Sequence, residues 1–162
     1  MIDPTLAIDK EYYIDLINDS CLSDANPGLF SYVLDTDKSK KEAIINLAKS
    51  KKLDVTIIND GNLDGEVISM EEWLNNIHSA DFVVTDSFHG CVFCIIFNKP
   101  FACIFNEGRG KDRFISLLKQ FKLEDRVLDE NFEDKDINWN SVNRIMEKLQ
   151  ENSRNFLSEN LQ

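Results

Sequence analysis

Residues 81–105 constrain the fold of this chain more than any other stretch of it. They hold a short β-branched run (82–85), a polar turn, an apolar run (91–97) and a second apolar run (101–105). Continuous apolar strands next to an apolar helix are typical of a parallel sheet that is covered on both faces. The polar turn is then expected at the carboxyl end of a strand and the amino end of a helix. Open α/β sheets bind ligands, and anions in particular, at such places.

The rest of the sequence repeats this alternation of strand and helix. Runs with strand character occupy residues 29–34 and 54–58, with a short edge strand at 127–128. Helical periodicity occurs at residues 9–18, after Ser39, after Ser69 and around residues 114–121. Both Ser39 and Ser69 are followed three residues later by glutamate, which is the pattern of a capping box. The sequence therefore predicts an α/β, three-layer, Rossmann-like domain with a mostly parallel sheet.

We expect one domain, since 162 residues are enough for a single core. Residues 1–28 would form a connector and a first helix, residues 29–137 the α/β core, and residues 138–162 a C-terminal helix that frays beyond Asn152. The order of the strands cannot be predicted from one sequence.

The charge balance excludes some partners. The chain has 18 basic and 29 acidic side chains, a net charge of −11 at pH 7. Such acidity disfavours nucleic acid and anionic membranes as partners. No apolar run reaches the roughly 20 residues of a membrane span, and the first residues do not resemble a signal peptide. The four cysteines lie mostly in apolar runs, which favours reduced thiols and a cytoplasmic location.

The polar turn at residues 86–90 is the most informative candidate site. Asp86 or Ser87 is expected to cap the following helix, so that the first N–H groups of that helix point outward. Gly90 would let a ligand approach the backbone closely. His89 could donate a hydrogen bond to a phosphate, act as an acid, or only hold the turn together. No third partner for Ser87 and His89 is evident, which argues against a serine-hydrolase triad.

A basic segment surrounds and follows the apolar run at residues 101–105. Residues 99–126 contain seven basic and four acidic side chains, a local charge of +3 in a chain of −11. A local positive field in an acidic protein suits an anionic ligand. Arg109 and Arg113 flank Gly110 in a predicted basic loop, and we expect at least one of them to contact the ligand.

Other polar patterns have simpler interpretations. Cys91 and Cys94 form a CxxC pair, but the second pair of a zinc site is missing and both lie among apolar residues. Asp60, Asp64 and Glu66 lack the spacing of a calcium loop and fit a solvated turn better. Trp73 and Trp139 are interpreted as core or rim packing. We therefore expect no metal site.

Three segments resemble the polysaccharide pyruvyl transferase family: MEEWL at residues 70–74, ADFVVTDSFHG at 80–90 and IIFNKPF at 95–101. Weaker similarity extends to DPTL at residues 3–6 and to residues 113–126, so the resemblance covers nearly the whole chain. The turn at residues 86–90 is its most specific part.

The resemblance implies a lobe similar to the C-terminal lobe of two-lobed glycosyltransferases of the GT-B kind. Members transfer pyruvate from phosphoenolpyruvate to a sugar of a cell-surface polysaccharide, usually as a ketal. By resemblance, His89 would contact the donor phosphate or act as an acid, and the helix start near Ser87, Phe88 and Gly90 would hold the same anion. Arg109 and Arg113 would bind the carboxylate or phosphate of the donor, since arginine forks match both. No cofactor is expected beyond this donor substrate.

Family members are normally longer, with an amino-terminal lobe before this one. We therefore expect the chain to need that lobe or a partner chain, and to bind phosphoenolpyruvate weakly without turnover when alone. Exposure of a surface that faces such a lobe would favour self-association into a homo-oligomer. Two alternatives remain: the lobe of a nucleotide-sugar glycosyltransferase, and a non-catalytic assembly module.

Overall fold

The computed structural model describes residues 3–20, 22, 25, 27–35, 37–59, 68–105 and 110–160. Its four strands form one parallel sheet in the order β2-β1-β3-β4. The strands are β1 (Leu29–Val33), β2 (Val55–Asn59), β3 (Phe82–Thr85) and β4 (Phe101–Cys103). The chain places β2 on one side of β1 and β3 on the other. The carboxyl ends of β1 and β3 therefore meet at a topological switch point, where α/β sheets bind ligands.

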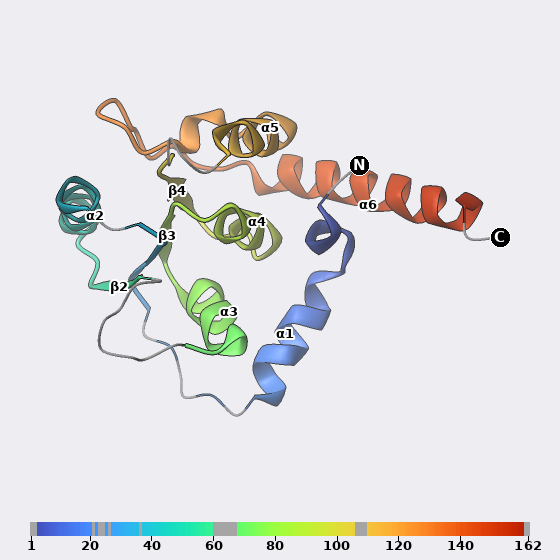
Figure 1. Ribbon diagram of the computed structural model, residues 1–162, viewed down its shortest axis with the longest axis horizontal. Coiled ribbons are helices and arrows are strands. Elements are labelled where there is room, and N and C mark those ends of the chain that lie inside the picture. The colour runs from blue at the N-terminus through green and yellow to red at the C-terminus, as the bar shows by residue number, and fades with distance from the viewer. Residues whose placement is uncertain are drawn as a thin grey trace.

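Helices cover both faces of the sheet (Figure 1). One face carries α2 (Lys38–Lys51). The other carries α3 (Met70–Ser79), α4 (Phe88–Ile96) and α5 (Lys111–Phe121). Outside these lie the 3-10 helix η1 (Pro4–Ala7), α1 (Lys10–Asp19) and the long α6 (Trp139–Asn160). A short 3-10 turn, η2 (Glu124–Arg126), follows α5. The predicted three-layer α/β fold is confirmed, with a sheet that is parallel throughout.

The alternation of side chains along β3 separates two cores. Phe82 and Val84 pack with α2, whereas Val83 joins the core beneath α3, α4 and α5. Successive strand residues point to opposite faces of a sheet, so a run that is apolar at every position serves both. All four residues of β3 are buried, as the continuous apolar run predicts.

The two predicted capping boxes have different outcomes. Ser69 caps α3 as expected, and its Oγ accepts a hydrogen bond from the Glu72 N–H at 3.1 Å. The box at Ser39 is wrong, because α2 begins earlier. Asp37 is its cap, with Oδ1 accepting from the Lys40 N–H at 2.8 Å. An aspartate two positions upstream caps as well as serine does, and it lengthens the helix.

Two further boundaries differ from the sequence predictions. Residues 127–128 do not form a strand: Val127 makes an isolated parallel bridge with Cys103. The C-terminal helix is continuous from Trp139 through Asn160 rather than frayed beyond Asn152. Tertiary contacts explain its length, since Gln150 Nε2 donates to the Leu6 carbonyl at 2.9 Å. Arg154 also pairs with Asp9 at 2.9 Å. Among the described residues, no helix is long and apolar enough to span a membrane.

Candidate functional site

The turn between β3 and α4 is fixed to the sheet by hydroxyl groups. Ser87 is the N-cap of α4, and its Oγ accepts from the Gly90 N–H at 3.3 Å. The Ser87 N–H donates to Thr85 Oγ1 at 3.0 Å, and Thr85 Oγ1 donates to the Tyr32 carbonyl at 2.6 Å. Within the described residues, the N–H groups of Phe88 and His89 make no hydrogen bond. These are donors of a first helical turn, where the macrodipole favours an anion.

Asp86 supports this turn from the other side. Its side chain is fully buried and pairs with Lys40 Nζ at 2.9 Å. It also accepts from the Leu34 N–H at 2.6 Å. Of the two predicted caps, Ser87 therefore caps α4, and Asp86 joins the end of β3 to α2 and to the chain after β1.

Three of the predicted binding residues converge. His89 Nε2 lies 3.8 Å from Asp3 Oδ2, and Arg113 NH2 lies 3.9 Å from the same oxygen. The Arg113 guanidinium carbon is 4.2 Å from the centroid of the Phe88 ring, close enough for a cation–π contact. Phe88 also meets the His89 ring edge to face, with centroids 5.5 Å apart. Phe88 thus holds both cation-capable side chains on one side of the turn.

Arg113 reaches this position from a helix rather than from the predicted basic loop. Lys111, Asp112 and Arg113 form the first turn of α5, and only Gly110 of the described loop residues precedes it. Arg109 lies outside the residues that the structure describes, as do Asp60, Asp64 and Glu66.

Gly90 has a packing role that the sequence did not reveal. A Cβ atom at this position would lie 2.6 Å from Thr85 Oγ1 and 2.9 Å from Thr85 Cγ2. Gly90 is buried, and its N–H is already bonded to Ser87. The absence of a side chain lets α4 approach β3. The predicted ligand contact at Gly90 stays a prediction.

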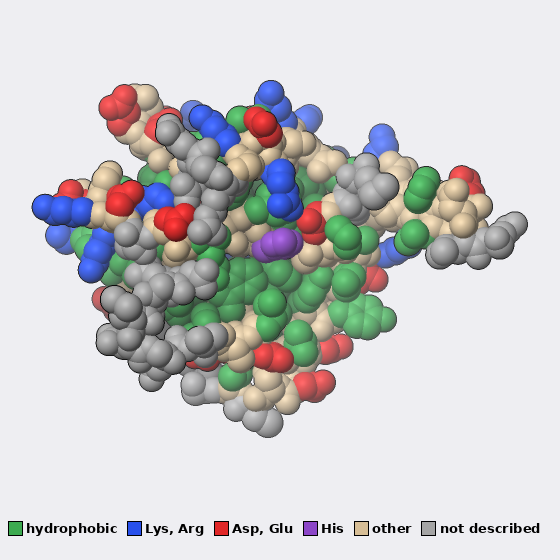
Figure 2. Space-filling view, in the orientation of Figure 1, with side chains coloured by type: hydrophobic (Ala, Val, Ile, Leu, Met, Phe, Trp, Pro, Cys, Tyr) green, Lys and Arg blue, Asp and Glu red, His purple; other side chains and the backbone are tan. Residues whose placement is uncertain are grey.

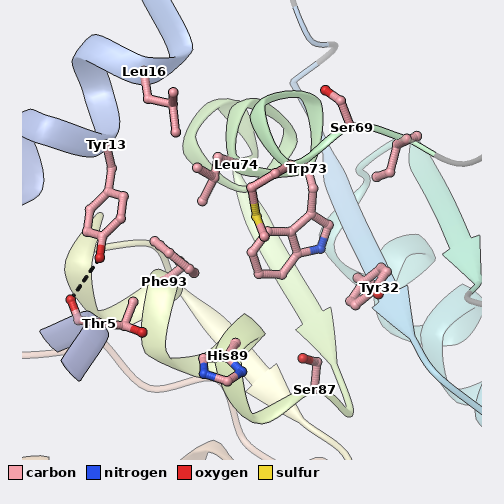
Figure 3. A pocket seen from close by; sticks show the side chains of 12 residues that line it. Thr5, Tyr13, Leu16, Tyr32, Ser69, Trp73, Leu74, Ser87, His89 and Phe93 are labelled. Atoms are coloured by element: carbon pink, nitrogen blue, oxygen red, sulfur yellow. Dashed lines mark hydrogen bonds between the residues drawn. The ribbon is translucent and has the colours of Figure 1, made fainter. Parts of the chain in front are cut away.

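A pocket of about 570 Å³ opens beside the turn, at the switch point of the sheet. Figure 3 shows its side chains, which come from η1, α1, β1, α3 and α4. Tyr32 and Ser87 lie at the strand ends, and Trp73 and Phe93 form the wall between α3 and α4. In Figure 2 a histidine (purple) lies at the rim of an apolar hollow (green), with a basic side chain (blue) above it.

The wall of the pocket is a set of aromatic rings in edge-to-face contact. Tyr13 and Phe93 have centroids 4.9 Å apart, Trp73 and Phe93 5.4 Å, and Tyr32 and Trp73 5.5 Å. The Tyr13 hydroxyl donates to the Thr5 carbonyl at 3.0 Å. Burial, and then the charge of Asp3, raise the pKa of Tyr13, so this hydroxyl stays protonated. The Trp73 Nε1 is buried, and within the described part of the chain it has no hydrogen-bond partner.

The three cysteines that the structure describes are packing residues. Cys91, Cys94 and Cys103 are free and buried, and burial raises the pKa of the Cys91 and Cys94 thiols. A raised pKa keeps a thiol protonated and poor as a ligand or nucleophile. In the described part of the chain, no group of three or more His, Cys, Asp or Glu side chains could hold a metal ion.

Sequence reasoning missed several residues of the site. From the sequence alone, Asp3 belongs to a connector, Tyr13 to one face of a short helix, and Trp73 to core or rim packing. Tyr32 was only a strand residue. Each has an ordinary local role, and only the parallel strand order brings their side chains together beside Ser87 and His89.

Fold and site together define an α/β domain with a candidate anion site at its switch point. The sequence model of the family described as polysaccharide pyruvyl transferase matches residues 1–107. The chain therefore belongs to the polysaccharide pyruvyl transferase family. The match includes the turn with His89 and ends before Arg113.

No curated protein matches the sequence significantly. Among solved structures, the chain is similar to one in the crystal structure of the RPS4 and RRS1 TIR domain heterodimer. The identity is 14%, the TM-score is 0.37, and the match covers 76% of this chain and 96% of that one. A TM-score this low carries no argument about function.

Proposed function

We propose that this chain is the donor-binding lobe of a polysaccharide pyruvyl transferase and that it binds phosphoenolpyruvate at the turn between β3 and α4. The observation that carries the proposal is the convergence of His89 and Arg113 on a single carboxylate oxygen, at 3.8 and 3.9 Å. The family match supports the same class of reaction.

The Asp3 carboxylate marks where a negative group of the donor would lie. Both contacts are long, and His89 and Arg113 are 53% and 63% exposed. The Asp3 side chain is 16% exposed, and its other oxygen accepts from the Thr5 N–H at 3.0 Å. Long contacts made by exposed side chains contribute little to stability, so His89 and Arg113 can turn from Asp3 to a ligand at small cost. Phosphoenolpyruvate carries a carboxylate and a phosphate, and the free N–H groups of Phe88 and His89 add donors for one of them.

The proposed reaction balances without a cofactor. Two hydroxyl oxygens of a saccharide bond to the central carbon of phosphoenolpyruvate, and the bond from that carbon to the phosphate oxygen breaks. One hydroxyl proton ends on the methylene carbon, which becomes methyl, and the other ends on the released phosphate. His89 contacts the phosphate or supplies a proton, and the fork of Arg113 binds the carboxylate or phosphate.

We further propose that catalysis requires a second lobe or a partner chain that covers this site. The pocket beside His89 opens to the surface in Figure 2. Water must be excluded while charge develops on the donor. The lobe alone is then expected to bind donor without forming a ketal.

Thermal unfolding of the 162-residue chain with phosphoenolpyruvate tests the proposal. Phosphoenolpyruvate should raise the Tm in a concentration-dependent way, and a nucleotide sugar such as UDP-glucose should not. Changing His89→Ala or Arg113→Ala should weaken phosphoenolpyruvate binding about tenfold or more, since each removes a charge-assisted contact.

Lys38→Ala is a matched control, because Lys38 is 92% exposed, also pairs with one carboxylate, Glu42, at 3.8 Å, and lies on α2, away from the pocket. It should leave phosphoenolpyruvate binding unchanged. Selective stabilisation by UDP-glucose would instead favour a glycosyltransferase lobe. No response to either compound would favour the assembly module.

A further inference from the structure

The pocket beside His89 has two chemically distinct parts. Ser87 and His89 form one end, near Asp3 and Arg113. The remainder is lined by the rings of Tyr13, Tyr32, Trp73 and Phe93 (Figure 3), and by the apolar side chains of Leu16, Ile68, Met70 and Leu74. Its volume of about 570 Å³ falls within the roughly 300–1,000 Å³ of pockets that hold drug-sized ligands. A three-carbon donor at the His89 end leaves the aromatic part free.

The aromatic part suits an uncharged ligand. Among the described residues that line the pocket there is no Lys, Arg, Asp or Glu side chain, and His89 is the one titratable group besides the tyrosines. The rings hold one another edge to face, with centroid distances of 4.9 to 5.5 Å, so their positions are mutually fixed. Fixed ring surfaces favour the C–H faces of a sugar over a strongly hydrated anion.

The indole of Trp73 supplies a second, independent observation. Trp73 is only 8% exposed, and its Nε1–H has no hydrogen-bond partner among the residues that the structure describes. An unsatisfied buried donor is costly, and native structures rarely keep one without a reason. A ligand oxygen that accepted from Nε1 would remove this cost. A sugar presents such oxygens around an apolar ring.

Two serine hydroxyls extend the polar rim of the same cavity. Ser69 Oγ accepts from Glu72 and Ser87 Oγ accepts from Gly90, so each oxygen acts as an acceptor while its proton remains available to a ligand. The cavity thus offers several hydrogen-bond donors around an aromatic floor.

We propose that the aromatic part of this pocket binds a neutral pyranose ring of the saccharide acceptor. Trp73 Nε1–H donates to a hydroxyl oxygen of that ring, and the reacting hydroxyls point toward His89. This assignment rests on the proposed function, because it takes the His89 end as the donor site. Trp73 is a residue that binds and positions the acceptor.

Direct binding of simple glycosides to the full chain tests the assignment. In a Trp139→Phe background, Trp73 is the sole tryptophan and reports on its own surroundings. The probes are methyl β-D-galactopyranoside, methyl β-D-glucopyranoside and N-acetylglucosamine, with cyclohexanol as an apolar ring without the pattern of hydroxyls. We expect at least one glycoside to change the Trp73 fluorescence saturably, with a dissociation constant on the order of 1 mM.

The variant Trp73→Phe keeps an aromatic ring and removes the N–H group. Saturation-transfer NMR should show that it weakens glycoside binding about three- to tenfold, the effect of one lost hydrogen bond. Tyr12→Phe is the control, because Tyr12 is 70% exposed and does not line the pocket. Circular dichroism melts verify that each variant is folded.

The outcomes separate this inference from the proposed function. If phosphoenolpyruvate raises the Tm but no glycoside perturbs Trp73, the acceptor assignment is overturned and the donor site stands. If a glycoside binds but phosphoenolpyruvate does not, the pocket is a sugar site and the proposed donor function is overturned. The acceptor assignment would also be overturned if cyclohexanol bound as tightly as any glycoside and Trp73→Phe left that binding unchanged. Such a result would indicate a pocket for an apolar segment.

Discussion

The two faces of the sheet are built from the same strands but differ in content. Toward α2, the core consists of aliphatic side chains and Phe82, and one helix closes it. Toward α3, α4 and α5, the core is rich in aromatic side chains and includes the wall of the pocket. Aliphatic side chains fill the core on the α2 face. On the opposite face, aromatic rings in edge-to-face contact leave the pocket between them.

This difference separates stability from function within one domain. The described candidate residues Ser87, Phe88, His89 and Arg113 all belong to α4, its cap or α5, on the aromatic side. Asp86 is the exception, because it lies at the end of β3 and pairs with Lys40 of α2. Changes on the α2 face should affect folding alone, whereas changes at Asp86 should affect both folding and binding.

The largest effect is expected for Asp86→Ala. It would leave the Leu34 N–H without its partner and the largely buried Lys40 ammonium with the Asp35 carbonyl but no carboxylate. Breaking a buried pair in this way lowers the free energy of unfolding by about 3–5 kcal/mol. Urea unfolding measures it, and phosphoenolpyruvate binding should weaken in parallel. Asp37→Ala is the control, since an exposed cap contributes about 1 kcal/mol. Equal losses for the two variants would contradict the link between the faces.

The change Ile44→Ala tests the α2 face alone. Ile44 is fully buried in that core, and truncation should lower the free energy of unfolding by about 2–4 kcal/mol. Phosphoenolpyruvate affinity, measured where the variant is folded, should be unchanged. Leu157→Ala on the exposed side of α6 should alter stability by less than about 0.5 kcal/mol. A loss of donor affinity in Ile44→Ala would show that the faces are not independent.

The change Gly90→Ala tests the approach of α4 to β3 on the aromatic face. The added Cβ would meet the Thr85 side chain, at 2.6 Å from Oγ1, and overpacking of this kind costs about 1–3 kcal/mol. Chemical denaturation of Gly90→Ala, Thr85→Ala and the double variant forms a cycle. The double variant should be more stable than additivity predicts, because removal of the Thr85 side chain relieves the contact. Strict additivity would rule out this steric explanation.

The smallest effect concerns pH and His78, which lies on α3 with its ring 5.1 Å from that of Phe97. Burial, and then the nearby charges of Lys99 and Lys10, lower the pKa of His78 in the folded chain. Below about pH 6.5 the unfolded chain therefore binds a proton that the folded chain does not, and stability falls as the pH drops. Urea unfolding should show that, between about pH 7.5 and about pH 5.5, the free energy of unfolding falls less for His78→Gln than for the wild type. Identical falls would assign the dependence to other groups.

Local patterns predicted the elements well where one residue decides the outcome. The cap at Ser69, the apolar run of β3 and the helix start at Ser87 follow from short-range chemistry, and the structure confirms them. The predicted cap of α2 is two residues too late, because Asp37 and Ser39 can both cap a helix and the structure uses Asp37. The sequence underestimates the length of α6. Its apolar periodicity ends near Leu149, but contacts with η1 and the start of α1 support the helix beyond that point.

The candidate site was only half predictable. His89 and Ser87 lie within one short motif and were found together. Asp3 and Trp73 come from elements far apart in sequence, and their proximity to His89 depends on how those elements pack. A periodic pattern says which face of a helix is buried, and it does not say which distant side chain that face meets.

The contacts between α6 and the first residues also matter for the site. Gln150 holds the Leu6 carbonyl and Arg154 holds Asp9, so two side chains near the end of the chain brace the segment that carries Asp3 and Thr5. Shortening or destabilising α6 would remove these contacts and let the segment that carries Asp3 and Thr5 move away from His89. If the proposed donor site is correct, changes near residue 150 are expected to alter donor affinity without contacting the donor.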